Sequence, residues 1–457
     1  MDTVRINEKD NVCVNLETGH KIALCNIEKG SDIIKYGYPI GYATEDIVKG
    51  DTVHSHNMKT KLGDILSYEY KPNFKELSPL EPFTINAYIR KNGDIGIRND
   101  IWIIPTVGCV NSIAKQLSEK TGALYFPHPY GCSQLGDDQK ITQLILRGLI
   151  NHPNAGGILV LGLGCENNNI PEMQKVLGTW DDERIKFLSV QDCEDEIERG
   201  IELIENLKNI ASKDKRTPVP ASKLKIGLKC GGSDGFSGIT ANAVVGKVTD
   251  RICAMGATAV LTEVPEMFGA ELVLFERCKT KELFDKSVKL INDFKQYFKN
   301  HGEPVSENPS PGNKEGGITT LEEKSLGCVQ KGGTAPIVDV LDYGDTLEKS
   351  GLNLLNGPGN DIVSITNLSA VGCHLILFTT GRGTPLGGAV PTIKIASNDN
   401  IGTKKSHWID FSAYGEDKEK KADELMDIIR LVSDGKMTKN EIQGNREIAI
   451  FKDGVTL

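Results

Sequence analysis

One pattern recurs three times in the first half of the chain: a short run of apolar residues that stops at glycine and cysteine. In the clearest example, residues 158–161 read Ile-Leu-Val-Leu and the chain continues as Gly162-Leu163-Gly164-Cys165-Glu166. The other two runs lead to Gly108-Cys109 and Gly131-Cys132. A run without polar alternation is typical of a strand buried on both faces of a parallel sheet. We therefore predict an α/β fold in which three Gly-Cys pairs meet at the carboxyl edge of a sheet, where such folds bind ligands.

Charge and targeting signals narrow the partners of the chain. The 457 residues carry a formal net charge of -9 with both signs interspersed, which argues against nucleic acid or an anionic membrane surface as the main partner. The amino terminus has no secretory pattern, and no apolar run approaches the roughly 18 residues of a membrane span. We expect a cytoplasmic protein that acts on a small molecule, and the sequence allows a homo-oligomer. The 11 cysteines are then expected to be thiols, metal ligands or core residues without disulfides.

Length and linker composition predict three units. A chain of 457 residues is too long for one hydrophobic core. Residues 1–75 alternate short β-like runs with Gly and Asp turns, as in a compact β domain, and residues 76–86 form a proline-bearing linker. Residues 87–212 alternate strand and helix, which predicts a mostly parallel sheet. After a charged, proline-ended linker at 213–223, the same alternation returns in 224–457 and predicts a second α/β domain.

Two histidines lie near the end of the first unit. Its last predicted strand runs into His54-Ser55-His56, and positions i and i+2 of a strand point to the same face. Two imidazoles side by side could bind a divalent metal or hold a proton relay. The alternative, which we favour for an arbitrary His-x-His pair, is a surface strand whose histidines have no function.

Polar residues at other strand ends are further candidates for a site. Glu166 follows a buried strand, where a carboxylate needs a partner. Ser233 and Asp234 lie in a glycine-rich turn before a predicted helix, where free backbone amides favour an anion. Arg382 stands between two glycines, which leaves its guanidinium free to fork onto a carboxylate. Any one of these turns could also be only a tight turn. Residues 307–333 are predicted to be a long functional loop.

Taken together, these motifs resemble one known family, that of the altronate and galactarate dehydratases. The resemblance extends from the first unit to the closing residues 451–457 and is carried by long segments in one order. These segments are 53–57, 96–99, 105–111, 130–138, 162–168, 230–235, 308–314 and 380–385. The resemblance implies that the first unit is a SAF-type β domain. It also implies a hydro-lyase that converts D-altronate into 2-dehydro-3-deoxy-D-gluconate in hexuronate catabolism, with a divalent metal, ferrous iron first and manganese second.

The chemistry of such a dehydration suggests roles for the candidate residues. A metal that chelates the substrate carboxylate neutralises the enediolate formed when a base removes the C2 proton, and an acid helps the C3 hydroxyl to leave. The catalytic residues are expected to be His54, His56, Cys132, Cys165 and Glu166. The metal ligands are expected to be His54, His56 and Cys165. The substrate is expected to be held by Arg98, Asn99, Ser233, Asp234 and Arg382. The first domain must then close over the edge that carries the cysteines.

Two other functions stay open at this point. Cys109, Cys132 and Cys165 could bind an iron-sulfur cluster, in a dehydratase for another aldonate or for an aldarate such as galactarate. Acid-labile sulfide in anaerobically purified protein would favour that function. The chain could also be a sensor that binds a sugar acid without converting it, and the absence of a keto acid product would favour the sensor.

Overall fold

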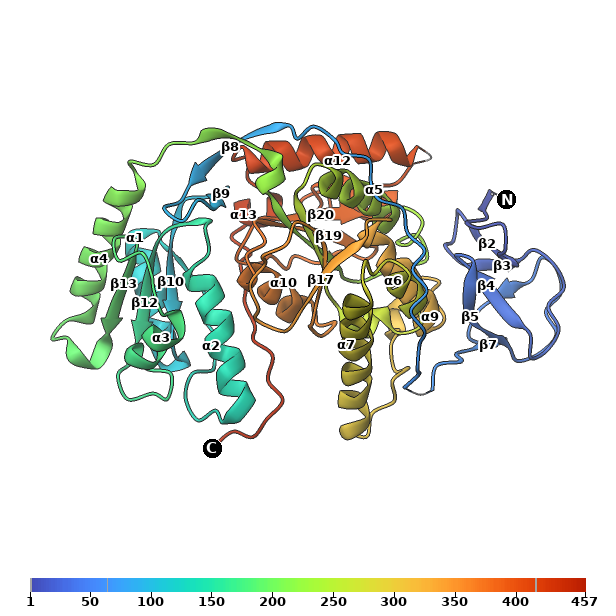
Figure 1. The fold of residues 1–457 in the computed structure, drawn as a ribbon, viewed down its shortest axis with the longest axis horizontal. Helices are drawn as coiled ribbons and strands as arrows, with labels where there is room; N and C mark the ends of the chain where they lie inside the picture. The colour runs from blue at the N-terminus through green and yellow to red at the C-terminus, as the bar shows by residue number, and fades with distance from the viewer. Residues whose placement is uncertain (1, 64, 416) are drawn as a thin grey trace.

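The computed structural model describes residues 2–63, 65–415 and 417–457, which form three domains in a row (Figure 1). The amino-terminal β domain lies at one end, the second domain at the other, and the C-terminal domain between them. The spatial order therefore differs from the order along the chain. Within the described residues, no helix combines the length and the apolar character that a membrane crossing requires.

The β domain consists of two small antiparallel sheets, with the orders β1-β2-β3-β6 and β4-β5-β7. Its strands are β1 (Thr3–Val4), β2 (Val12–Asn15), β3 (Lys21–Ala23), β4 (Asp32–Lys35), β5 (Tyr38–Ala43), β6 (Thr52–Val53) and β7 (Met58–Lys59). Val12, Ile33 and Ile40 are buried in a core that continues into the C-terminal domain. The compact β domain predicted for the first unit is confirmed.

An extended segment connects the β domain to the second domain across the C-terminal domain. Residues 65–83 contain no helix or strand, and their backbone bonds to the C-terminal domain through Asn73 and Leu80. The chain then enters the second domain through β8 (Thr84–Ile89) and leaves it through β14 (Thr217–Pro220), which pair with each other. With β9 (Ile95–Gly96), these strands form a three-stranded sheet. The chain therefore enters and leaves the second domain at one place.

The second domain has the predicted parallel sheet. Its strands, in the order β11-β10-β12-β13, are β10 (Asp100–Pro105), β11 (Leu124–Tyr125), β12 (Ala155–Gly162) and β13 (Ile185–Ser189). All pairs are parallel. The helices are α1 (Asn111–Thr121), α2 (Gly136–Ile150), α3 (Ile170–Leu177) and α4 (Glu196–Ala211). All eight residues of β12 are buried, as the uninterrupted apolar run predicted.

The C-terminal domain has a seven-stranded sheet, in which every pair is parallel, in the order β17-β18-β16-β15-β19-β20-β21. Its strands are β15 (Lys225–Cys230), β16 (Thr258–Leu261), β17 (Ile337–Leu341), β18 (Gly351–Leu355), β19 (Leu375–Thr380), β20 (Thr392–Ala396) and β21 (Phe411–Ser412). Successive strands are added first on one side of β15 and then on the other. The order therefore reverses at β15, and ligands of open α/β sheets bind at the carboxyl ends of strands at such a reversal.

The helices of the C-terminal domain flank this sheet. They are α5 (Ala241–Ala254), α6 (Glu271–Phe275), α7 (Lys281–Asn300), α8 (Pro311–Glu315), α9 (Leu321–Cys328), α10 (Asp361–Ala370), α11 (Asp399–Lys404), α12 (Lys418–Ser433) and α13 (Lys439–Ile442). Helix α10 packs against α2 of the second domain. Their backbones approach so closely at Gly148 that a Cβ there would lie 2.1 Å from the carbonyl oxygen of Ala370. A shared core joins the two domains.

The expectation of a long loop at 307–333 was wrong. This segment contains α8 and α9, and all eight residues of α9 are buried. A helix that is covered on every side needs no alternation between an apolar and a polar face. Because its charged residues Glu322, Glu323 and Lys324 are buried as well, the sequence of α9 lacks the helical periodicity of a surface helix.

Candidate active site

The three Gly-Cys loops lie together at the carboxyl edge of the second-domain sheet. The Gly108 amide donates to the Tyr130 carbonyl (2.8 Å), and the Asn168 amide donates to the Gly131 carbonyl (3.0 Å). Each of the three loops is therefore tied to a neighbour. Their cysteines, Cys109, Cys132 and Cys165, are all exposed. Since cysteine is among the most buried residue types, three exposed thiols on adjoining loops are unusual.

Glu166 is buried at this edge, and its carboxylate stabilises the loop that contains it. Its Oε1 accepts hydrogen bonds from Thr106 Oγ1 (2.7 Å) and the Leu163 amide (3.0 Å), and its Oε2 accepts one from the Gly164 amide (2.6 Å). Burial raises the pKa of Glu166, but these hydrogen bonds outweigh burial and hold the pKa below its ordinary value. The carboxylate has the partners that its position demanded, and they belong to the loop structure.

Arg98 and Asn99 lie away from both strand-end edges, so the structure does not bring them to the expected substrate site. The guanidinium of Arg98 is buried and forks onto the two carboxylate oxygens of Glu441 (2.7 and 2.9 Å). Its remaining hydrogen bonds go to the carbonyls of Ile97, Val432 and Lys436. Asn99 bonds to Arg90 and to the Ala211 carbonyl. The Arg98 contacts join the second domain to the C-terminal domain.

His54 and His56 do not share a strand face, and this expectation was wrong. Strand β6 ends at Val53, and residues 54–57 form a turn in which the Asn57 side chain accepts from the His54 amide (3.0 Å). Asparagine favours such local bonding over a strand ladder. His54 turns toward Thr319 of the C-terminal domain (Nδ1 to Oγ1, 2.7 Å), whereas His56 is exposed.

A buried ion triad docks the β domain onto the C-terminal domain. Lys21 and Lys35 of the β domain both contact Glu323 of α9, at 2.7 and 2.8 Å. Lys21 also donates to Thr319 Oγ1 (2.8 Å). Burial raises the pKa of Glu323, but the two lysines outweigh it and hold the pKa at about 2. Burial lowers the pKa of Lys21 to about 8, although Glu323 opposes the shift, because Lys21 shares this single carboxylate with Lys35.

Thr319 orients the His54 ring, and burial is the main influence on its pKa. The Thr319 hydroxyl oxygen accepts from Lys21, which has no acceptor of its own, so the hydroxyl proton is free to donate to His54 Nδ1. Burial lowers the pKa of His54, and the positive charges of Lys21 and His20 lower it further. His54 is thus a neutral imidazole at physiological pH.

Ser233, Asp234 and Arg382 meet at the carboxyl edge of the C-terminal sheet. The Asp234 carboxylate accepts a hydrogen bond from the Asn398 side chain (2.8 Å). It also packs closely against Gly381, where a Cβ would lie 2.3 Å from the Asp234 carboxyl carbon. Ser233 accepts through its carbonyl from Asn313 (2.8 Å). Arg382 is half exposed, pairs with Glu315 (3.1 Å) and lines an open cavity of about 580 Å³. Leu16 and Glu17 of the β domain line the same cavity.

We use the name interdomain site for the residues around this contact between the β domain and the C-terminal domain. They are His54, Ser233, Asp234, Thr319 and Arg382. Segment 308–320 contains Thr319 and contacts the other four: Asn313 bonds to Ser233, Gly312 to Arg382 (3.4 Å), Gly316 lies against Asp234, and Thr319 bonds to His54. Cys132, Cys165 and Glu166 are on the second domain, at the other end of the molecule from His54 (Figure 1).

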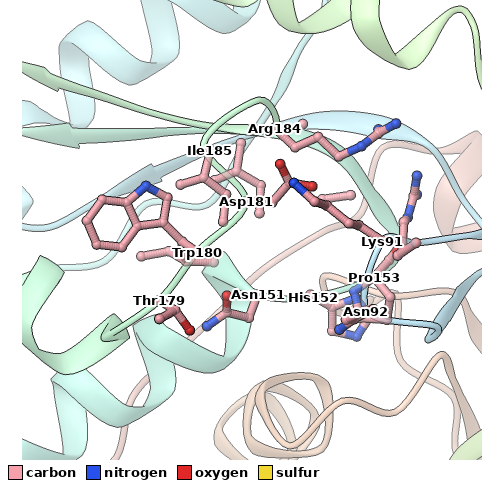
Figure 2. A pocket seen from close by; sticks show the side chains of 15 residues that line it. Lys91, Asn92, Asn151, His152, Pro153, Thr179, Trp180, Asp181, Arg184 and Ile185 are labelled. Atoms are coloured by element: carbon pink, nitrogen blue, oxygen red, sulfur yellow. The ribbon is translucent and has the colours of Figure 1, made fainter.

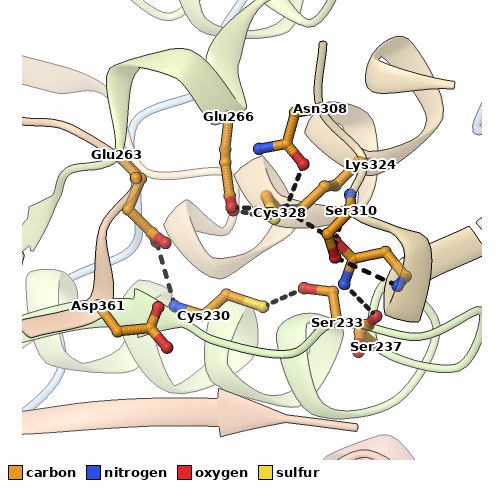
Figure 3. A network of polar contacts seen from close by, with 12 residues as sticks. Cys230, Ser233, Ser237, Glu263, Glu266, Asn308, Ser310, Lys324, Cys328 and Asp361 are labelled. Carbon is orange, nitrogen blue, oxygen red and sulfur yellow. Dashed lines mark hydrogen bonds and ion pairs between the residues drawn. The ribbon is translucent and has the colours of Figure 1, made fainter. Parts of the chain in front are cut away.

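A second group of functional candidates was not identified from the sequence. Seven ionisable side chains lie buried together near the carboxyl ends of β15 and β16. Figure 3 labels Cys230, Glu263, Glu266, Lys324 and Cys328 among them. We call them the acid–base cluster: Lys229, Cys230, Glu263, Glu266, Lys324, Cys328 and Lys331. One signal was available, since Lys229 interrupts an otherwise apolar strand. The others lie after strands or in α9 and the turn that follows it, where a charged residue is unremarkable until the packing is known.

Another cavity, of about 390 Å³, lies at the opposite end of the second-domain sheet from the cysteine loops. Trp180, Arg184 and Lys91 line it, together with residues that precede β12 (Figure 2). It is therefore at the amino ends of the strands, whereas parallel sheets bind their ligands at the carboxyl ends. We do not place the active site there.

The expected metal ligands do not form one site. His54 contacts Thr319, His56 is exposed, and Cys165 is on another domain. Among the side chains in the described ranges, no three from His, Cys, Asp and Glu are gathered as a metal ion would require. The ligand set His54, His56 and Cys165 therefore does not fit a metal in this arrangement of the domains.

An arginine beside an open cavity, a neutral imidazole and a buried acid–base cluster are the parts of an enzyme that moves protons on a small acidic molecule. Comparison with known proteins gives the family. Residues 221–456 match "D-galactarate/Altronate dehydratase, C-terminal", residues 87–212 match "D-galactarate dehydratase/Altronate hydrolase, second domain", and residues 15–61 match "Altronate/galactarate dehydratase SAF domain". The chain belongs to this family of sugar-acid dehydratases and is a hydro-lyase.

Individual relatives span nearly the whole chain. The altronate dehydratase of Escherichia coli K12 is 52% identical over 96% of this chain and 92% of its own length. The altronate dehydratase of Bacillus subtilis 168 is 51% identical over 99% of this chain and 94% of its own length. The galactarate dehydratase (L-threo-forming) of E. coli K12 is 32% identical over 87% of this chain and 81% of its own length.

Proposed function

We propose that the chain dehydrates D-altronate to 2-dehydro-3-deoxy-D-gluconate in hexuronate catabolism, and that it does so at the interdomain site. The observation that carries the proposal is the 52% identity with an altronate dehydratase across all three domains, against 32% with a galactarate dehydratase. The location of the site is inferred from the charge of the substrate, because the carboxylate of a sugar acid needs a cationic side chain to bind it. Arg382 is half exposed beside the 580 Å³ cavity, at the strand-end edge of the C-terminal sheet.

Two side chains have clear tasks in this proposal. Arg382 pairs with the exposed Glu315 at 3.1 Å, and a substrate carboxylate would replace that partner with a better-aligned fork. The pKa of His54 is lowered by burial and by the neighbouring positive charges, so its imidazole is suited to accept the C2 proton. A general base must be unprotonated at working pH. Asp234 is engaged by Ser397 and Asn398 (2.9 and 2.8 Å), so its task is to hold the turn that carries Ser233.

We also propose that activity depends on a divalent metal, ferrous iron or manganese. The support is chemical: abstraction of a proton beside an ionised carboxylate forms an enediolate, whose charge a cation would stabilise. The ligand set expected from the sequence does not assemble, so the ligands are left open and no step is assigned to the metal. The cytoplasmic location and the lack of a nucleic-acid partner stay predictions.

A panel of hexonates and hexarates, incubated with ferrous iron and a reductant with and without chelator, tests the proposed function. We expect keto acid from D-altronate at least tenfold faster than from galactarate, and loss of that activity with chelator that added metal restores. Faster conversion of galactarate would reject the substrate. Full activity in chelator would reject the metal. No keto acid from any member would favour the sugar-acid sensor.

The two histidines are expected to behave differently. His54→Gln should lower kcat by roughly 10²- to 10⁴-fold, the usual contribution of one proton-transfer group, because His54 is half-buried at the interdomain site. His56→Gln should leave kcat within threefold, since His56 is exposed. Steady-state kinetics on both variants, with circular dichroism to confirm the fold, decides the matter. An equal loss in both would restore their joint assignment.

One rival enzyme keeps specific support. Cys109, Cys132 and Cys165 are exposed on adjoining loops at a strand-end edge, as the ligands of an iron-sulfur cluster would be. Against this, no three ligand side chains are gathered within the described residues. Iron and acid-labile sulfide measured on anaerobically purified protein, with a Cys132→Ala variant as the comparison, distinguish the two enzymes.

A further inference from the structure

The acid–base cluster contains more buried charge than a core tolerates without function. Every member is at most 8% exposed. Its carboxylates are shared: Glu263 contacts Lys229 and Lys331 (3.2 Å to the latter), and Glu266 pairs with Lys324 (2.8 Å). Burying an ion is costly even when it is paired. Such groups are concentrated at sites that transfer protons, and the tasks given above to Arg382 and His54 do not use them.

Two sulfur atoms lie at the centre of the cluster. The Cys328 thiol donates to Glu266 Oε2 (2.8 Å), and Cys230 Sγ faces both Cys328 and the hydroxyl of Ser233, at 2.6 Å from Ser233 Oγ. A thiol has one proton, and that of Cys328 is directed to Glu266. The hydroxyl of Ser233 is then the proton donor available to Cys230 (Figure 3).

Counting charges indicates the ionisation state of Cys230. The cluster holds three buried ammonium groups, on Lys229, Lys324 and Lys331, but two buried carboxylates, on Glu263 and Glu266. A third carboxylate, Asp361, reaches only Lys229 (3.0 Å), and about a third of its side chain is exposed. A thiolate at Cys230 would balance the buried charges, whereas a neutral thiol would leave three ammonium groups sharing two fully buried carboxylates.

The pKa shifts point the same way. The interaction with Cys328 lowers the pKa of Cys230 most, and Lys331 and Ser233 add to it, so that the pKa lies at about 5 despite burial and the charge of Glu266. The pKa of Cys328 is raised by its interaction with Cys230 and by burial. Burial also raises the pKa of Glu263, to about 7, which leaves still less negative charge against the lysines.

The β domain covers this sulfur pair. Ser233, Lys324 and Cys328 line a cavity of about 10 Å³, room for a single water, and Lys35 and Tyr36 of the β domain close it. The Tyr36 hydroxyl fits between two glycines, where a Cβ at Gly238 would lie 2.1 Å from it. Gly232, the residue before Ser233, faces Arg382: a Cβ at Gly232 would lie 3.5 Å from Arg382 Cβ. Ser233 therefore contacts Cys230 and adjoins the glycine that faces the arginine proposed to hold the substrate.

We propose that Cys230 is held as a thiolate that polarises Ser233 and serves, through it, as the proton reservoir of the dehydration, with Cys328 and Glu266 fixing its state. This rests on the proposed function for the identity of the substrate and for the role of His54. In balanced form, His54 accepts the C2 proton and passes it to Ser233 as the Ser233 hydroxyl proton moves to the Cys230 sulfur. Ser233 then gives a proton to the departing C3 hydroxyl and takes one back from Cys230, so that water leaves and the thiolate is restored. Cys230 is a positioning residue, since it acts on the substrate through Ser233.

The test compares Cys230→Ser, Cys230→Ala and a matched control, Cys373→Ala, which removes an equally buried thiol of the same domain outside the cluster. In Cys230→Ser we expect kcat to fall at least 100-fold with KM within threefold. The wild-type kcat should fall on the acid side as the thiolate is protonated, and that limb should be absent in the variant. Cys373→Ala should keep the wild-type profile. A loss of less than threefold in Cys230→Ser, or an unchanged acid limb, would overturn the proposal.

A second measurement does not depend on turnover. The ultraviolet absorbance of a thiolate, followed against pH in the folded protein, should show one group titrating well below the ordinary cysteine pKa, and this group should be missing in Cys230→Ala but present in Cys373→Ala. If it is missing from the wild type, the thiolate is rejected whatever the substrate. If wild type leaves altronate unchanged but dehydrates another sugar acid, the proposed substrate fails and the relay is tested on that other acid.

Discussion

Glu323→Gln is expected to lower the free energy that keeps the β domain docked by about 3–5 kcal/mol, the usual result of removing one partner from a buried ion pair. The carboxylate lies between Lys21 and Lys35, and all three side chains are at most 2% exposed. Glutamine keeps the shape but leaves two buried ammonium groups without a counter-charge. Native-state hydrogen exchange of strands β2 to β5 measures the opening of the β domain directly.

The controls for this prediction use the same domain. Glu45→Gln removes an exposed carboxylate and should change the opening free energy by less than about 0.5 kcal/mol. Lys21→Met should cost less than Glu323→Gln, because it leaves Lys35 and Glu323 as a balanced pair. If Glu323→Gln changes the opening free energy by less than about 1 kcal/mol, the triad does not dock the domain.

The Glu323 carboxylate also determines how the docking free energy of the β domain changes as the pH falls. The pKa of Glu323 is held at about 2 in the folded protein, below its ordinary value of 4.5. A carboxylate with a depressed folded pKa stabilises fully above the unfolded pKa and loses that contribution as pH falls toward the folded one. The difference between wild type and Glu323→Gln should therefore shrink as the pH falls from 4.5 toward 2.

Arg98→Met is expected to lower the unfolding free energy by about 3–5 kcal/mol while leaving KM within twofold, because the buried Glu441 would keep only its longer ion pair with Arg446 (3.6 Å). Arg98 makes five hydrogen bonds, to Glu441 and to three backbone carbonyls. Denaturant unfolding and steady-state kinetics on the same preparation measure both quantities. The substitution distinguishes a residue that joins two domains from one that holds a substrate.

For Arg382→Met we expect the opposite result to Arg98→Met, with little change in stability and a raised KM. Arg382 is half exposed, with one ion pair to an exposed partner, so its loss should hardly change the stability. KM should rise roughly 10- to 100-fold if Arg382 holds the substrate carboxylate, the worth of a charged hydrogen bond. The reverse pattern, with KM raised by Arg98→Met and unchanged by Arg382→Met, would return Arg98 to the site and remove Arg382 from it.

Much of the fold could be predicted because its signals are local. Apolar runs that end at glycine gave β10, β11 and β12, and the alternation of strand and helix gave two parallel sheets. The segment 321–328 could not be predicted as a helix, because burial on every side removes the periodicity on which such a prediction rests. The His54-His56 pair failed for a similar reason, since the Asn57 side chain decides between strand and turn.

The candidate site was predictable in parts but not as an assembly. Ser233, Asp234 and Arg382 could be chosen because they follow strands of one parallel sheet, which places them at one edge whatever the rest of the chain does. Lys21, Lys35 and Glu323 gave no signal, because each is an ordinary charged residue until a partner from a distant segment meets it in the core.

The amino-acid sequence by itself determined the strands, their parallel sheets and the edges where cysteines, glycines and Arg382 gather, because each depends on residues close together in the chain. Only the tertiary structure decided that the β domain packs on the C-terminal domain and not over Cys165 and Glu166. That choice depends on the pairing of Lys21 and Lys35 with Glu323, about 300 residues away. No local pattern records which buried charges will meet.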